Sequence, residues 1–347
     1  MSTSKRVMPM PETKLPNAPK IPLARYLRAE KDDAPITAAT VVAPDAIKVG
    51  HPDTVALDRT TALDDWLQAS PQAVTTVEIP ANFADTTPIR IDGSKLGGGV
   101  LKITVGANAH VALQERWASV GSNVGLAVQL DAEEGAQVDW LTYDAFTAEV
   151  VLAQRTANLG KDAKLNWTVA GFAHNSGATI LTTNLNGSGS EATVNVGVLA
   201  SGKQRIGYAT AITNYAQKTV GHINQRGVIV DKAHLVFNGV GHIVQGARGS
   251  DSQQENRVLM LSETARGDAN PILLIDENDV TAGHAASVSR VDANQMYYLM
   301  SRGVPERVAK RLVIRGFLEA GLSEIEDPDL RDELFATIDE TLVNADA

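Results

Sequence analysis

Hydrophobic and polar residues alternate through the middle of the chain, from about residue 76 to 290. Runs such as "VLKITV", "LAVQL", "ATVNVGVL" and "HLVF" are rich in Val, Ile, Leu and Thr, and Gly, Asn, Asp or Ser residues separate them. An apolar period of two is typical of strands that are buried on one face, and no helix-length apolar pattern interrupts the series. The pattern therefore predicts many short β-strands joined by tight turns.

Short segments that contain alanine recur along this region at a similar interval. Each follows a turn and opens a predicted strand, and the intervals are 29, 27, 29 and 41 residues between Ala107, Ala136, Ala163, Ala192 and Ala233. The best match is "GAQVDW" (135–140) with "DAKLNW" (162–167). A step of about 28 residues with several strands predicts one turn of a β-solenoid. Chance recurrence of a common residue is the alternative, and the longest interval would require an inserted loop or an irregular turn.

Two amphipathic patterns near the N-terminus predict packing helices. In the segment 21–30 the apolar residues Leu23, Tyr26 and Leu27 share a helical face, and the segment 58–70 has the same arrangement. Prolines interrupt this part of the chain. We expect residues 1–75 to form a helical and irregular segment in front of the strands.

Three amphipathic helices are predicted after residue 290. The first runs from a capping Asp292 to Gly303, the second begins at Pro305 and ends at Gly321, and the third begins near Pro328. The predicted inward-facing residues are Val308, Ala309, Leu312, Val313 and Phe317 in the second helix, and Leu330, Leu334, Ile338 and Leu342 in the third.

Charge is divided between these helices. The second helix carries Arg307, Lys310, Arg311 and Arg315, whereas residues 319–346 contain ten carboxylates and one arginine. This division suits pairing of the helices with each other or binding in the groove of a partner. Solvated helix faces are the alternative.

Composition narrows the class of protein. The chain has 347 residues, of which 44% are hydrophobic, and this is enough for a buried core. The net charge of −10 argues against nucleic-acid binding, which needs a concentrated basic surface. The sequence has no cysteine and no apolar run of about 18 residues, so we expect a cytoplasmic protein without disulfides.

Histidine is the main candidate for site chemistry, because no thiolate is available. The spacings of the histidines do not match a zinc helix, and no G-x-S-x-G elbow supplies a hydrolase nucleophile. His222 and His242 follow glycine and are expected to make structural hydrogen bonds. His284 lies in "DVTAGHAASVSR", where its neighbours are unusually small.

The stretch from residue 222 onward resembles the SufB/SufD family of iron–sulfur cluster assembly proteins. The family pattern is a strand with Phe-x-Gly, an acidic Gln-x-x-Asn segment, a Leu-rich strand, Pro before a strand ending in Asp-Val, a histidine-containing turn of small residues, and a helix ending in Tyr-Leu-x-Ser-Arg-Gly. The matching residues here are Phe237, Gly239, Asp251, Gln253, Asn256, Leu259–Leu261, Pro271, Asp279, Val280, His284 and Tyr298–Gly303.

The resemblance implies a right-handed parallel β-helix with helical ends. The expected segments are an N-terminal segment (1–75), a β-helix core (76–290) and a C-terminal helical segment (291–347). The short length and the "GHAAS" turn are more similar to SufD than to SufB, which has an acidic, cysteine-containing turn at this position. Many SufD members have a cysteine where this chain has Ala282, and their N-terminal region is longer.

The resemblance also implies a non-enzymatic scaffold subunit. SufD pairs with SufB through the end of the β-helix, and the C-terminal helical segment docks the SufC ATPase. His284 would contribute an imidazole to a transient iron–sulfur cluster shared with SufB. In the docking segment we expect contacts from Tyr298, Arg302, Gly303, Arg307, Arg311 and Arg315. Flavin binding by the complex and a homodimer without SufB are left open.

Two other functions remain as alternatives at this point. A stand-alone β-helix enzyme acting on polysaccharide would need a carboxylate cluster with a nearby arginine on one face. A SufB-like chain would need the cysteine that receives sulfur, which this sequence lacks.

Overall fold

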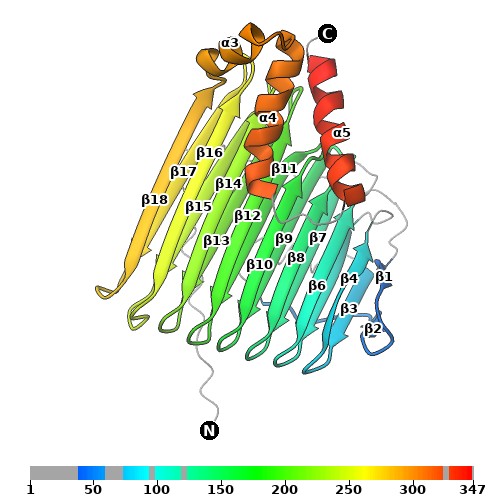
Figure 1. Cartoon of the computed structure of the whole chain (residues 1–347). Coiled ribbons are helices and arrows are strands. Elements are labelled where there is room, and N and C mark those ends of the chain that lie inside the picture. Colours follow the sequence, from blue (N-terminus) through cyan, green and yellow to red (C-terminus); the bar gives the residue numbers. More distant parts are fainter. Residues whose placement is uncertain (1–37, 59–72, 94–97, 119–122, 323–327, 346–347) are drawn as a thin grey trace.

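Two facing β-sheets form a solenoid in the computed structural model, which describes residues 38–58, 73–93, 98–118, 123–322 and 328–345 (Figure 1). Each sheet has nine strands in this described part of the chain. The first sheet contains, in order, β1 (Thr40–Val42), β4 (Ala84–Asp92), β6 (His110–Trp117), β8 (Gln137–Asp144), β10 (Lys164–Gly171), β12 (Glu191–Ala200), β14 (Val220–Ile229), β16 (Asp251–Met260) and β18 (Thr281–Arg290). The second contains β2 (Lys48–Gly50), β3 (Ala73–Ile79), β5 (Gly98–Val105), β7 (Asn123–Ala132), β9 (Val150–Leu159), β11 (Ser176–Leu185), β13 (Arg205–Asn214), β15 (His234–Ile243) and β17 (Arg266–Ile275).

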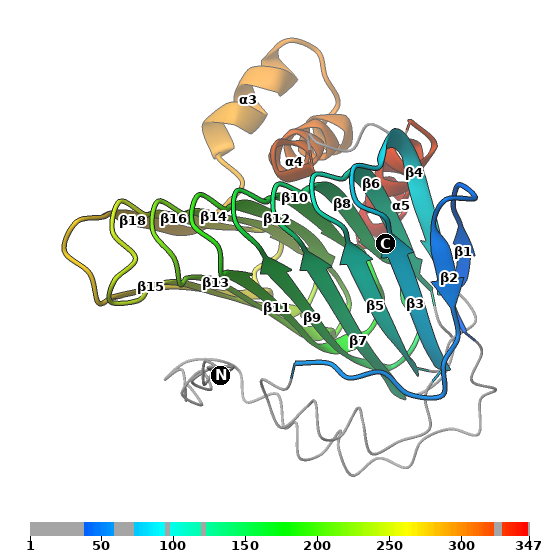
Figure 2. The ribbon, with the colours of Figure 1, turned by 90° about the horizontal axis from the view of Figure 1, so that it is seen from below.

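The chain passes from one sheet to the other and back, so each of about eight turns adds a strand to both sheets (Figure 2). Strand pairs from β3 and β4 onward are parallel, and the short strands β1 and β2 pair antiparallel at the opposite end from β17 and β18. The predicted parallel solenoid is confirmed. The two N-terminal helices predicted from the sequence lie outside the described residues, apart from Asp58.

The step of the solenoid agrees with the predicted spacing. Paired residues in β6, β8, β10 and β12 are 27 residues apart along the chain, and the step lengthens to 31 residues between β14 and β16. The prediction of an inserted loop or an irregular turn in the longest alanine interval is wrong. Ala192 lies in β12 of the first sheet, whereas Ala233 directly precedes β15 of the second sheet, so the interval is about one and a half regular turns.

Inward-facing side chains of both sheets make the core. The matched segments 135–140 and 162–167 lie directly beside each other, because Trp140 pairs with Trp167 in the ladder of β8 and β10. Their indole rings stack with centroids 4.2 Å apart and planes 5° apart, and both are fully buried. Such aromatic pairs add stabilisation beyond the apolar area that they bury.

Three helices follow the last strand: α3 (Ala293–Ser301), α4 (Glu306–Leu322) and α5 (Pro328–Ala345). Asp292 caps α3 by accepting a hydrogen bond from the backbone N–H of Asn294 at 2.8 Å, and Gly303 has a φ of 87°, as expected after a helix end. α4 lies over β10, β12 and β14, on the outer face of the first sheet (Figure 2). No helix in the described part of the chain has the length and apolar character needed to cross a bilayer.

The inward face predicted for α5 is confirmed, and the face predicted for α4 is partly wrong. Leu330, Leu334, Ile338 and Leu342 of α5 are all buried. In α4, Ala309 is buried as predicted, but Leu312 is 48% exposed and the buried stripe continues through Ile314, Leu318 and Leu322. Gly197 in β12 leaves room for the side of α4 that carries Leu322, since a Cβ on this glycine would lie 2.8 Å from Leu322 Cδ2. Gly321 does not end the helix, which extends at least to Leu322.

Candidate functional site

The solenoid has an open end at β17 and β18. Each of these strands pairs with a preceding strand on one side, and no strand of the described residues covers the other side (Figure 1). Val288 is 41% exposed, although its ladder neighbour Val258 is 1% exposed. In the second sheet, Ile275 is 39% exposed and its neighbour Ile243 is fully buried. The interior of the solenoid is therefore exposed at this end, together with two strand edges that carry unpaired backbone groups.

His284 lies on this open end, in strand β18 and not in the turn that the sequence suggested. It pairs in register with Gln254, whose side chain is buried among the inward-facing residues of β16. His284 occupies the same row, but it is exposed because no further turn covers it. Within the described residues its imidazole has no hydrogen-bond partner. Ala282 and Ala286 on the same face leave the ring accessible to a second chain.

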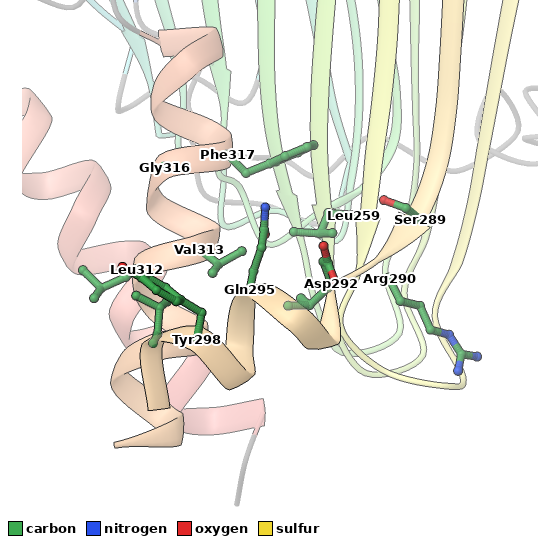
Figure 3. Close-up of a pocket in the computed structure, with 12 residues that line it drawn as sticks. Leu259, Ser289, Arg290, Asp292, Gln295, Tyr298, Leu312, Val313, Gly316 and Phe317 are labelled. Atoms are coloured by element: carbon green, nitrogen blue, oxygen red, sulfur yellow. The ribbon is translucent and has the colours of Figure 1, made fainter. Parts of the chain in front are cut away.

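A groove of about 650 Å³ separates α3 from α4 and the end of the first sheet (Figure 3). Its lining is largely apolar and includes Leu259, Val291, Tyr298, Leu299, Leu312, Val313 and Phe317. Tyr297, Tyr298, Met300 and Leu312 are among the exposed large hydrophobic side chains of the described residues. Such a cluster of exposed aromatic and aliphatic groups is typical of a protein-binding surface.

The six residues expected to contact a partner have different surroundings in the structure. Tyr298 lines the groove, with the guanidinium of Arg302 5.3 Å from its ring centroid, and Gly303 forms the adjacent turn. Arg307 is exposed at the start of α4. Arg311 and Arg315 instead form ion pairs within the chain.

Arg311 Nε lies 3.4 Å from Oδ1 of Asp339 in α5, and Arg315 pairs with the other oxygen of the same carboxylate. The division of charge between the C-terminal helices therefore holds α4 against α5. α5 is in turn fixed to the solenoid by Glu333, which accepts two hydrogen bonds from Arg116 of β6 at 2.7 and 3.0 Å. The interpretation as helix-on-helix pairing is confirmed for these two arginines.

Comparison with known proteins agrees with this architecture. The family model described as "SUF system FeS cluster assembly, SufBD core domain" matches residues 94–317, which is more than half of the chain and includes the open end, α3 and most of α4. The chain belongs to this family. The chain is 47% identical to the iron–sulfur cluster assembly protein SufD of Bacillus subtilis over 188 residues, and the aligned part is 54% of this chain and 43% of the relative. A SufBD family protein of Mycobacterium tuberculosis is 41% identical over 111 residues, 32% of this chain and 28% of its own length.

Four other histidines of the SufBD core pair with aspartates of the following turn. His222 lies 3.0 Å from Asp251 and His242 lies 3.0 Å from Asp276, each measured from Nε2 to a carboxylate oxygen. His234 and Asp268 are 2.7 Å apart, and His110 is 3.7 Å from Asp139. The structural hydrogen bonds expected for His222 and His242 are confirmed, and these contacts distinguish them from His284.

The described part of the SufBD core has no group of three or more His, Cys, Asp or Glu residues that could hold a metal ion. Among the described residues of the open end, His284 offers one nitrogen ligand, and imidazole is a ligand that iron accepts.

A buried ionic cluster inside the SufBD core was not found from the sequence. Arg155 of β9 makes two hydrogen bonds to Asp144, at 2.5 and 3.2 Å, and its Nε lies 3.4 Å from Glu115. All three residues are at most 1% exposed. Burial raises the pKa of Glu115, and Arg155 and the hydroxyl of Thr142 oppose this effect. Burial likewise raises the pKa of Asp144 against the attraction of Arg155.

The sequence did contain a signal for this cluster. Glu115 lies between Leu113 and Trp117, and Arg155 lies between Ala153 and Ala157, so both charges fall in the apolar phase of their strands. A charge in that phase indicates a buried ion pair once the strand register is known.

Proposed function

We propose that this chain is a SufD-like scaffold subunit in iron–sulfur cluster assembly, with no catalytic activity of its own. Membership of the SufBD core family and the similarity to SufD of Bacillus subtilis support this proposal. The subunit pairs with a SufB-like chain at the open end and docks a SufC-like ATPase through its C-terminal helices.

The geometry of the open end supports the proposed pairing with a SufB-like chain. β17 and β18 each present a ten-residue edge, and the interior residues Ile275 and Val288 are half-exposed beside them. A protein that stays monomeric normally caps or charges such an edge. A second β-solenoid placed end to end would pair both edges and cover both apolar side chains. A SufB-like chain fits this geometry, and a second copy of this chain offers the same surface in a homodimer.

His284 is the proposed contribution to the site at that junction. Its imidazole is exposed, has no hydrogen-bond partner in the described part of the chain, and is flanked by glycine and alanine. The nascent cluster is cargo that the two subunits share. Because this chain has no cysteine, the thiolate ligands that iron prefers would come from the partner.

The groove between α3 and α4 is the proposed docking surface for the ATPase subunit. Tyr298 lines it, the guanidinium of Arg302 lies over the Tyr298 ring, and Gly303 and the exposed Arg307 follow in the chain. Arg311 and Arg315 act indirectly by holding α4 against α5.

The alternative of a polysaccharide-degrading enzyme receives no support from the carboxylates of the core. Glu115, Asp144 and Arg155 have the composition that such a site would need, but their side chains are at most 2% exposed. A polymer cannot reach them without opening the solenoid.

Co-expression with a SufB-like and a SufC-like subunit tests the proposal. Val288→Glu places a charge on the open end and should abolish recovery of the SufB-like chain by size-exclusion chromatography. Val42→Glu is the matched control, because Val42 is an exposed valine (65%) at the opposite end of the same sheet. Equal recovery of the SufB-like chain with both variants would reject pairing through β17 and β18.

A further inference from the structure

Three amide side chains lie inside the solenoid close to its open end. Gln225 of β14 and Asn256 of β16 are fully buried, and Gln254 of β16 is 5% exposed. Gln225 and Asn256 are ladder partners, and Gln254 is the preceding inward-facing residue on β16. Polar side chains therefore replace apolar ones over two successive turns of the core.

Most polar atoms of these amides have no partner among the described residues. Both side-chain atoms of Gln225, both of Asn256 and Oε1 of Gln254 make no hydrogen bond. Gln254 Nε2 alone is used, and it donates to the carbonyl of Ile272 in β17 at 2.7 Å. The hydroxyl of Thr210, on the second sheet, is also buried and unpartnered.

The side chains of Gln254 and Asn256 meet beside Gly239 of β15. A Cβ on this glycine would lie 2.4 Å from Gln254 Oε1 and 3.0 and 3.3 Å from the Nδ2 and Oδ1 of Asn256. Thr210 is the ladder neighbour of Gly239 in the preceding turn, just as Gln225 is the neighbour of Asn256. The unpartnered groups thus form one cluster across the two sheets.

The cluster has apolar neighbours on one side and lies next to the open end on the other. Further along the solenoid, the neighbours of Gln225 and Thr210 are the apolar residues Val196 and Leu181. Toward the open end, the neighbour of Gln254 is His284, and the side chains of β17 are only partly buried. A small molecule would enter past His284.

The chemistry of the cluster indicates the ligand. Amides and a hydroxyl offer both donors and acceptors, and the cluster contains no ionised side chain that would select a metal ion or an anion. Buried polar groups in folded proteins are almost always paired, and an unpaired one costs about 1–3 kcal/mol. Buried water pairs such groups, typically through about three hydrogen bonds for each molecule.

We propose that Gln225, Gln254 and Asn256 bind a cluster of buried water molecules that enters the solenoid from its open end beside His284. This site does not depend on the identity of any partner subunit. Water held there would hydrate His284 from inside the solenoid when its outer side is covered.

A high-resolution crystal structure of the full chain tests the site directly. Water molecules should lie about 2.7–3.2 Å from the side-chain atoms of Gln225 and Asn256 and from Gln254 Oε1. Rotated amides that bond to one another or to Thr210, with no solvent density between them, would overturn the proposal.

Oxygen-17 relaxation dispersion gives a second measurement, because it counts long-lived waters in solution. Replacing Gln225 and Asn256 by leucine should remove long-lived waters from the count. Replacing Asn195 and Asn224, an outward-facing amide pair of the neighbouring strands, should leave the count unchanged. An unchanged count in the core variant would also overturn the proposal, and a core variant that fails to fold leaves the crystal structure as the deciding result.

Discussion

Replacement of Arg155 by methionine should destabilise the chain by about 3–5 kcal/mol, the range for breaking a buried ion pair from one side. Methionine keeps much of the volume but removes the only charge that balances Asp144 and Glu115 in this cluster. Asp144 loses two hydrogen bonds, and Glu115 retains the one from Thr142 Oγ1 at 2.5 Å. Bulk solvent does not screen these charges, because Arg155 and Glu115 are fully buried.

Glu115→Gln is the matched control. The amide oxygen can still accept the hydrogen bond from Thr142, and Arg155 and Asp144 remain as a neutral pair. We expect a change below about 1 kcal/mol, in either direction, since one uncompensated carboxylate is removed from the core.

The stability of Glu115→Gln should also depend on pH differently from that of the wild type. Burial raises the pKa of Glu115, so the folded state binds a proton more tightly than the unfolded state. This contribution to stability is complete below the ordinary glutamate pKa and is lost as the pH rises through the folded pKa. Glu115→Gln removes this dependence, so its stability relative to the wild type should improve from about pH 4 upward.

Urea unfolding followed by circular dichroism at several pH values measures both effects. The reasoning would be refuted if Arg155→Met unfolded within about 1 kcal/mol of the wild type, because the carboxylates would then have another means of compensation.

Three further substitutions test the junction, the groove and the helix contact. His284→Ala should keep the melting temperature and assemble with its partners but accumulate less cluster. His284→Asn should not restore cluster accumulation. His242→Ala should instead lose about 1 kcal/mol of stability and build cluster normally. Leu312→Glu should abolish binding of the ATPase subunit in a pull-down, whereas Val42→Glu should not. Gly197→Val should destabilise the chain by about 1–3 kcal/mol in thermal unfolding, because its side chain would collide with the last turn of α4. Full cluster assembly with His284→Ala, retained binding with Leu312→Glu, or an unchanged melting temperature for Gly197→Val would contradict these assignments one by one.

The strands and their repeat were predictable because period-two alternation directly reflects burial on one face. The register of Trp140 with Trp167 followed from two matching segments. The assignment of strands to the two sheets did not follow, since strands of both sheets show the same alternation. Ala192 and Ala233 were therefore treated as equivalent although they belong to different sheets.

The sequence identifies His284 as the candidate residue but does not give its place in the fold. His284 was placed in a turn because its small neighbours resemble turn residues, yet pairing with Gln254 holds it in an edge strand. The buried face of α4 was misplaced because apolar residues occur on more than one side of the helix. A glycine in the sheet, Gly197, selects the side that carries Leu322, and this contact has no signature in the helix sequence.

The open end also links the stability of the last turn to the binding of any chain that docks there. Every interior turn of the solenoid is stabilised by two neighbouring turns, whereas β17 and β18 have a neighbour on one side only. Their local free energy of opening should therefore be lower than that of the interior turns, and their amide hydrogens should exchange faster. A chain that docks end to end supplies the missing interface term, so ordering of the last turn and subunit association become one linked equilibrium.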